Sequence, residues 1–395
     1  MGEVTGGRRA AWVAGGYAAQ GLGYAALVTA LPQLKERQGV DDTYVSVILL
    51  LVCVAAAGGS VVADKVAARW GSRFALAGGL LTVAVALALI TVRTPVVAFS
   101  AVLIIYGVGL GAVDASLNMQ GVLVQARLGR SVMNRLFAAY TAAAIIAALL
   151  MSAFAAGGAG ASVAVGVASL FAFAYVVTAW HALEPARTVA AHHPAHVTGT
   201  GTRRIILVCG AFVFTGFLAD SAISTWSSIY LDDSLAAPVA VAPLGYAAYQ
   251  ATVLLSRLTG DHLVPRLGRT TAVTAALLIC ALGCGLVTAV PSIAVAIAGF
   301  ALAGLGVGLL IPLAFSAAGE AAAGRSDEVI ARVNLFNYGG ALLGAVLLGA
   351  LSEPVGLRLA FLIPVLGLLL TLPVVRALRH LPAAPAIAAP TVIGK

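Results

Sequence analysis

The chain has 395 residues, of which 61% are hydrophobic and only 10% are charged, and its mean hydropathy is +1.03. Soluble globular domains carry about 25% charged residues because their surfaces face water. The low charge content therefore excludes a soluble catalytic or binding domain, and it indicates that most of the surface faces lipid.

Apolar runs recur along the chain at lengths that suit membrane-spanning helices, which need about twenty mostly apolar residues. The first part of the chain has six such runs, at 10–32, 43–63, 74–93, 96–125, 136–156 and 162–181. The second part has six more, at 205–231, 239–257, 270–290, 293–318, 333–351 and 359–376. The sequence therefore predicts an all-α membrane protein with twelve transmembrane helices.

The positive charges test this map, because cytoplasmic loops of membrane proteins are enriched in Lys and Arg. If the N-terminus is cytoplasmic, 19 of the 23 Lys and Arg residues fall on the cytoplasmic side. Only Lys35, Arg37, Arg93 and Arg358 fall on the other side. We therefore expect a multi-pass protein of the cytoplasmic membrane with both termini inside. The net charge of +8 is then a sign of topology and not of nucleic-acid binding.

Two loop segments indicate an internal duplication. The segment 64–73 reads DKVAARWGSR, and its Asp, Arg and Gly recur in 261–269, DHLVPRLGR, at an offset of 197 residues. The tripeptide Gly-Arg-Ser at 129–131 recurs at 324–326, at an offset of 195 residues. Two matches at nearly one offset predict two similar six-helix halves.

The longest polar stretch in the interior separates these halves. It contains His192, His193 and His196 among Pro, Gly and Thr residues. A metal site there is one interpretation, but nothing nearby supplies fixed ligand geometry, so a solvated cytoplasmic linker is favoured. The predicted organisation is an N-terminal half at 1–183, a linker at 184–204, and a C-terminal half with a short cytoplasmic tail at 205–395.

Only two acidic residues, Asp114 and Asp220, lie well inside the expected spans, one in each half, and no Lys or Arg does so. An ionised carboxylate in hydrocarbon costs several kcal/mol, so such residues usually face a cavity, carry a proton, or both. Burial favours the neutral form, which suits a group that takes up and releases protons. The alternative is that each acid stays protonated and only joins neighbouring helices by a hydrogen bond.

Other polar and aromatic side chains in the spans are candidates for the wall of a substrate cavity. Asn118 lies four residues after Asp114 and therefore shares its helix face. Aromatic residues with polar tips suit amphipathic organic solutes, although some belong instead to the belts at membrane interfaces. The candidates are Gln20, Tyr24, Asn118, Tyr140, Trp226, Tyr249, Gln250, Asn334, Asn337 and Tyr338.

Twelve spans in two halves, with an Asp-to-Arg-x-Gly loop after the second and eighth, resemble the major facilitator superfamily. The resemblance implies two parallel repeats around a central cavity, with substrate bound near the membrane midplane. It also implies a latch, in which loop acids pair with arginines and face the positive end of a helix. The latch residues would be Asp64, Arg69, Arg73, Asp261, Arg266 and Arg269. The alternative is that they merely anchor loops in the cytoplasm.

The segment 109–118, GLGAVDASLN, resembles the fucose permease branch of that superfamily, in which the acid implies a proton-coupling role for Asp114. Pro32-Gln33 at the end of the first span is also similar. Val28 stands where that branch has an Asp, so its two-acid scheme does not carry over intact. The segment 220–231 resembles poorly characterised bacterial relatives with an acid six residues before a Trp. That resemblance makes Asp220 the second intramembrane acid.

These observations predict a proton-linked secondary transporter of a small organic solute, with a sugar-like or other polar solute favoured. Export of a drug-like or specialised metabolite by proton antiport is an alternative, although the fifth span, 136–156, lacks the Gly-Pro typical of drug antiporters. A non-transporting membrane sensor is an alternative of another class. We expect a monomer that needs no cofactor or metal and is not an enzyme, since no histidine lies centrally in a span.

Overall fold

The computed structural model describes residues 2–128, 132–183, 200–321 and 326–378, and within these ranges the chain is helical and has no strand. The first six helices are α1 (Gly2–Gln38), α2 (Asp42–Trp70), α3 (Ser72–Thr91), α4 (Val96–Leu128), α5 (Met133–Ala156) and α6 (Ala161–Ala179). Then follow α7 (Thr200–Ile229), a π-helical turn (Tyr230–Ser234), α8 (Ala242–Leu267), α9 (Arg269–Ala289), α10 (Ile293–Ala321) and α11 (Ser326–Val355). The last span is divided into α12 (Leu357–Ala360), α13 (Leu362–Thr371), a 3₁₀ turn (Leu372–Val374) and α14 (Val375–Leu378).

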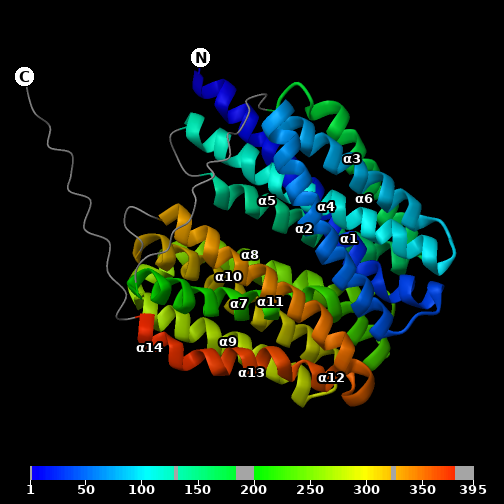
Figure 1. Cartoon of the computed structure of the whole chain (residues 1–395). Helices are drawn as coiled ribbons and strands as arrows, with labels where there is room; N and C mark the ends of the chain where they lie inside the picture. The colour runs from blue at the N-terminus through cyan, green and yellow to red at the C-terminus, as the bar shows by residue number, and fades with distance from the viewer. Residues whose placement is uncertain (1, 129–131, 184–199, 322–325, 379–395) are drawn as a thin grey trace, which may run out of the picture.

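The helices form two groups that match the expected halves. In Figure 1, α1 to α6 lie together in the upper part of the view and α7 to α14 in the lower part. Across the halves, α5 packs against α8, α2 against α11, and α1 against α7. We call the end of the bundle at which α1 begins the inner end, and the end at which α1 stops the outer end. The predicted topology places the inner end in the cytoplasm.

The duplication is repeated in the packing of the helices. Gly111 of α4 lies so close to the carbonyl group of Ala56 in α2 that any Cβ would overlap it. Gly308 of α10 stands in the same relation to Val253 of α8, and both residues of this pair are displaced by 197. Further contacts with the same offset are Gly107 with Val52, Gly304 with Tyr249, Gly109 with Gly79, and Gly306 with Ala276. The offset found in two loops therefore extends through the helix interfaces.

Two of the four cations expected at the outer end have a structural role there. Arg37 donates to the carbonyl oxygen of Ile90, at 2.6 Å, where α3 ends. Arg358 donates to the carbonyl oxygen of Thr288, at 2.7 Å, where α9 ends. The last carbonyl groups of a helix lack partners within the helix and carry partial negative charge, so a nearby cation stabilises them. These exceptions to the charge bias are thus helix caps.

Ten helical segments of the described chain are long and apolar enough to cross a membrane. Helices α1 and α8 are not among them, although they lie in the bundle and match two expected spans. Both carry amide, tyrosine and charged side chains that lower their hydropathy, and both supply residues of the site described below. Helix α7 already begins at Thr200, so residues 200–204 of the predicted linker are helical. The three linker histidines lie outside the described residues.

Candidate translocation site

The first predicted acid is held by an amide from the neighbouring helix. Gln20 Nε2 of α1 donates to Asp114 Oδ1 of α4 at 3.2 Å. One turn away on both helices, the Tyr17 hydroxyl group donates to Asn118 Oδ1 at 2.9 Å. Tyr17 and Gln20 are buried, whereas Asp114 and Asn118 are partly exposed. Tyr17 was not among the sequence candidates, but its place three residues before Gln20 puts it on the same helix face.

The second acid lies in a cluster of tyrosines. The buried Tyr249 hydroxyl group of α8 donates to Asp220 Oδ1 of α7 at 2.5 Å, and Asp220 is itself partly exposed. Gln250 Nε2 donates to the Tyr246 hydroxyl group at 2.6 Å. The hydroxyl groups of Tyr24, Tyr140 and Tyr246 also lie within electrostatic reach of Asp220. Asp220 therefore brings together predicted residues from α1, α5 and α8.

A cation missed by the sequence analysis completes this cluster. Arg257 was placed at the end of the expected eighth span, but α8 continues to Leu267, so Arg257 lies ten residues inside the helix. Its Nη1 donates to Thr141 Oγ1 of α5 at 3.0 Å and so joins the two halves. Arg257 is half-buried and within electrostatic reach of Asp220. The apolar run ends near this Arg, and hydropathy gave no sign that the helix continues.

The candidates on α11 lie nearer the inner end. Asn337 Nδ2 donates weakly to Asn334 Oδ1 at 3.4 Å, and both side chains are half-buried. Tyr338 is 54% exposed and lies within electrostatic reach of Asp114. Asp114 belongs to the other half, so Tyr338 and the first acid come from different halves.

Trp226 occupies a different kind of position from the other candidates. Its ring is fully buried, and Nε1 donates to the carbonyl oxygen of Ala345 in α11 at 2.8 Å. The side chain therefore packs α7 against α11 within the C-terminal half and is not accessible in this conformation.

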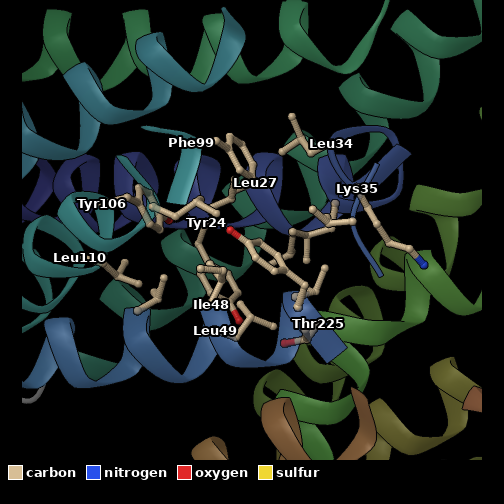
Figure 2. Close-up of a pocket in the computed structure, with 17 residues that line it drawn as sticks. Tyr24, Leu27, Leu34, Lys35, Ile48, Leu49, Phe99, Tyr106, Leu110 and Thr225 are labelled. Atoms are coloured by element: carbon tan, nitrogen blue, oxygen red, sulfur yellow. The ribbon is translucent and has the colours of Figure 1, made fainter. Parts of the chain in front are cut away.

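A narrow pocket of about 70 Å³ lies on the outer side of the two acids, and its lining residues Leu110 of α4 and Thr225 of α7 stand about one turn from Asp114 and Asp220. Figure 2 shows Tyr24 and Tyr106 near one part of the pocket and Lys35 at another. Most of the lining is aliphatic and comes from α1, α2 and α4, while Thr225 of α7 closes it from the other half. The hydroxyl group of Tyr106 is buried and has no hydrogen-bond partner in the described chain.

The two halves differ in side-chain size at the positions that line this pocket. Leu49, Val52 and Leu103 line the pocket, and Tyr246, Tyr249 and Phe300 stand at the positions displaced by 197. All three of these aromatic side chains are fully buried in the C-terminal half. At other lining positions the relation is reversed, since Phe99 and Tyr106 correspond to Ala296 and Ala303.

Solved transporter structures share this fold. A variant of the nucleoside transporter NupG superimposes with a TM-score of 0.75 at 13% identity, covering 94% of this chain and 99% of that one. A bacterial homologue of the human lysosomal transporter Spinster, inward-facing and unoccupied, gives a TM-score of 0.76 at 11% identity, covering 97% of this chain and 99% of that one.

Sequence comparisons point the same way. The profile of the Major Facilitator Superfamily matches residues 206–392. An uncharacterized MFS-type transporter of Yersinia pestis is 27% identical over 353 residues, which is 86% of this chain and 88% of that protein. The C-terminal half of the chain therefore matches the major facilitator superfamily in sequence, and nearly the whole chain matches solved transporters in fold. The membrane protein MosC of Rhizobium meliloti is also 27% identical, over 347 residues, 87% of this chain and 83% of that protein.

These matches support the predicted superfamily and confirm the fold of two six-helix halves. The matched family and the Yersinia pestis relative are transporters and not enzymes. The resemblance to the fucose permease branch stays a prediction, as do the roles of individual residues.

The two halves are joined at the outer end. Lys35 of α1 forms ion pairs with Asp42 of α2, at 2.5 Å, and with Asp233 of the other half. The Ser152 hydroxyl group of α5 donates to the carbonyl oxygen of Ala240, just before α8, at 2.5 Å.

The Lys35 ion pairs are expected to hold the outer end closed at every physiological pH. Burial alone would lower the pKa of Lys35, but hydrogen bonds to Asp233 and Asp42 outweigh it, so the pKa lies above its ordinary value. Because the pKa is raised, this stabilisation is complete below the ordinary Lys pKa, near 10.4, and is lost only as pH rises through the higher value.

Lys35→Met should therefore open the outer end. Hydrogen bonds to charged groups contribute about 1.5–3 kcal/mol, so we expect the open population to rise about tenfold or more. The measurement is labelling of a Leu34→Cys reporter by a membrane-impermeant maleimide, after the four native cysteines are replaced. Arg93→Gln removes an exposed cation at the same end and serves as the control. Equal labelling of the Lys35→Met and Arg93→Gln variants would contradict the prediction.

The predicted latch residues at the inner end are only partly in contact. Arg73 lies over the Trp180 ring of α6 at 5.1 Å, and Arg69 lies over the ring of its neighbour Trp70 at 5.0 Å. Arg269 forms an ion pair with Glu320 of α10. Asp64 and Arg266 are exposed, Asp64 has an interaction of its own, and the side chain of Asp261 lies outside the described residues. The latch stays a prediction.

Proposed function

We propose that this protein is a proton-coupled secondary transporter of a small organic solute, in which Asp114 and Asp220 carry the protons. The observation that supports this most is that each half holds one partly exposed carboxylate bonded to a neutral donor, Gln20 or Tyr249. An amide and a phenol can each both donate and accept hydrogen bonds. Either acid can therefore gain or lose a proton and keep its partner, which a fixed cation would not allow.

Transport would proceed by alternating access of the two halves, 1–183 and 205–395, around this site. The outer end is joined by Lys35 and Ser152 contacts, so the next step would release these contacts and separate the outer ends. We place the protein in the cytoplasmic membrane as a monomer with both termini inside, as the charge distribution predicts.

The pocket in Figure 2 bears on the kind of solute. Its aliphatic lining favours a solute with an apolar part, and the Tyr106 hydroxyl group offers a hydrogen bond to a polar atom. A sugar-like or other polar solute fits the polar side chains around Asp114 and Asp220, such as Gln20, Asn118 and Tyr249. The apolar pocket instead favours the second candidate function, export of an amphipathic metabolite by proton antiport.

The decisive test is proton flux in liposomes that contain the purified protein and an internal pH dye. Sugars, polyols, small acids and hydrophobic drugs are added outside in turn, with empty liposomes as the control. Internal acidification as a solute enters would establish symport, and a flux of opposite sign would establish antiport. Solute movement that never moves protons would contradict proton coupling while leaving transport intact.

A further inference from the structure

The position of Arg257 within the membrane needs a physical explanation. A helix rises about 1.5 Å per residue, so Arg257 lies about 15 Å from the inner end of α8, a helix about 39 Å long. The hydrocarbon core is about 30 Å thick and spans about 20 helical residues, so a span that begins at Ala242 places Arg257 about one turn inside the inner boundary of the core. A charged side chain at such depth is costly and by default marks a function.

The guanidinium group is only partly satisfied by the protein. It has five N–H donors, and one of them bonds to the neutral Thr141 hydroxyl group. No carboxylate of the described side chains lies within ion-pair distance of Arg257, and the side chain of Asp261, one turn later, is not among those described. A half-buried cation with only one acceptor among the described side chains can therefore accept an anionic ligand.

Arg257 also belongs to the site of the second acid. Its separation of seven residues from Gln250 and eleven from Tyr246 puts all three on one face of α8. Asp220 lies within electrostatic reach of Arg257 but does not form an ion pair with it. The two charges partly balance each other when Asp220 is ionised, and protonation of Asp220 leaves the cation unbalanced.

From this geometry we propose that the transported solute carries an anionic group, such as a carboxylate, which binds the guanidinium group of Arg257. The inference rests on the proposed transport function and names the solute class. A planar guanidinium group binds a carboxylate through two parallel hydrogen bonds, and the nearby tyrosines accept an apolar or aromatic body. Because protonated Asp220 leaves Arg257 unbalanced, the anion should bind more tightly as Asp220 takes up its proton.

The test measures thermal stabilisation of the purified full-length protein by matched probes. The anionic probes are gluconate and 4-hydroxybenzoate, and their neutral counterparts are glucose and 4-hydroxybenzyl alcohol. We expect at least one anion to stabilise the wild type and its neutral counterpart to have no effect. Arg257→Gln should weaken this binding at least tenfold, Arg257→Lys should retain part of it, and Arg203→Gln, which removes an exposed cation from α7, should leave it unchanged.

The pH dependence gives a readout that a merely structural arginine would not produce. Anion binding should tighten as pH falls, and Asp220→Asn should remove this dependence while keeping the binding. Neutral probes that bind as well as anions, full anion binding by a folded Arg257→Gln variant, or no effect of either anion would each overturn the proposal. Proton-linked flux of a neutral solute would overturn it and leave the proposed function standing. Anion binding through Arg257 without any transport would instead overturn the proposed function.

Discussion

Asp114→Asn is expected to reduce proton-driven accumulation of the solute to the level of empty liposomes. The amide that replaces the carboxyl group has nearly the same shape and can still accept the hydrogen bond from Gln20. The fold should therefore survive, while the group that carries the proton is lost. Exchange of labelled for unlabelled solute across the membrane, which needs no net proton movement, should continue.

The measurement compares accumulation under a pH gradient with exchange at equal pH in the same liposomes. Glu353→Gln, which removes an exposed acid at the outer end of α11, is the matched control. Undiminished accumulation by the Asp114→Asn variant would remove this residue from the coupling scheme. Loss of both activities would instead indicate a structural role for the Gln20–Asp114 bond.

The second large effect is expected at Gly349, where α11 meets the other half. A Cβ at this position would overlap the Ser46 hydroxyl group of α2 and the Trp226 ring of α7. Ser46 and Trp226 are themselves buried, so neither can easily move aside. Overpacking of this kind costs about 1–3 kcal/mol, which corresponds to a shift of roughly five- to hundredfold between conformations. Gly349→Ala should therefore oppose closure of the outer end and slow transport.

Maleimide labelling of the Leu34→Cys reporter tests this prediction too, since an open outer end exposes the pocket that Leu34 lines. Gly285→Ala provides a control, because a Cβ at that α9 glycine meets no atom within 4 Å. A Gly349→Ala variant that transports and labels like the Gly285→Ala variant would show that the halves do not need this close contact.

The sequence predicted the fold well because a bilayer imposes simple rules on length, polarity and charge. The spans, their pairing into halves, and the two intramembrane acids all follow from these rules. Side-chain partners were harder to predict, since they depend on how two helices are rotated against each other. Gln20 was a candidate, but nothing in the sequence showed that it would face Asp114.

Arg257 shows where hydropathy fails. A helix that packs against other helices can carry a polar face, which lowers its mean hydropathy without shortening the helix. The predicted span therefore ended at 257, while α8 continues to Leu267. Trp226 was expected to line the cavity because its ring has a polar N–H group. That N–H group instead donates to the backbone carbonyl oxygen of Ala345, and the ring is buried away from any cavity. Both outcomes depend on tertiary packing, which a single sequence does not reveal.

The glycine contacts that repeat at an offset of 197 have a mechanical consequence. In α2 with α4, and in α8 with α10, backbone touches backbone, so no side chain at these points can change rotamer to let the helices slide. Each pair is therefore expected to move as one rigid unit within its half. Gly21 of α1 and Gly344 of α11 contact the backbones of α5 and α7 in the same way. Movement during the transport cycle is therefore left to the contacts between the halves, such as that of α1 with α7, where side chains can rearrange.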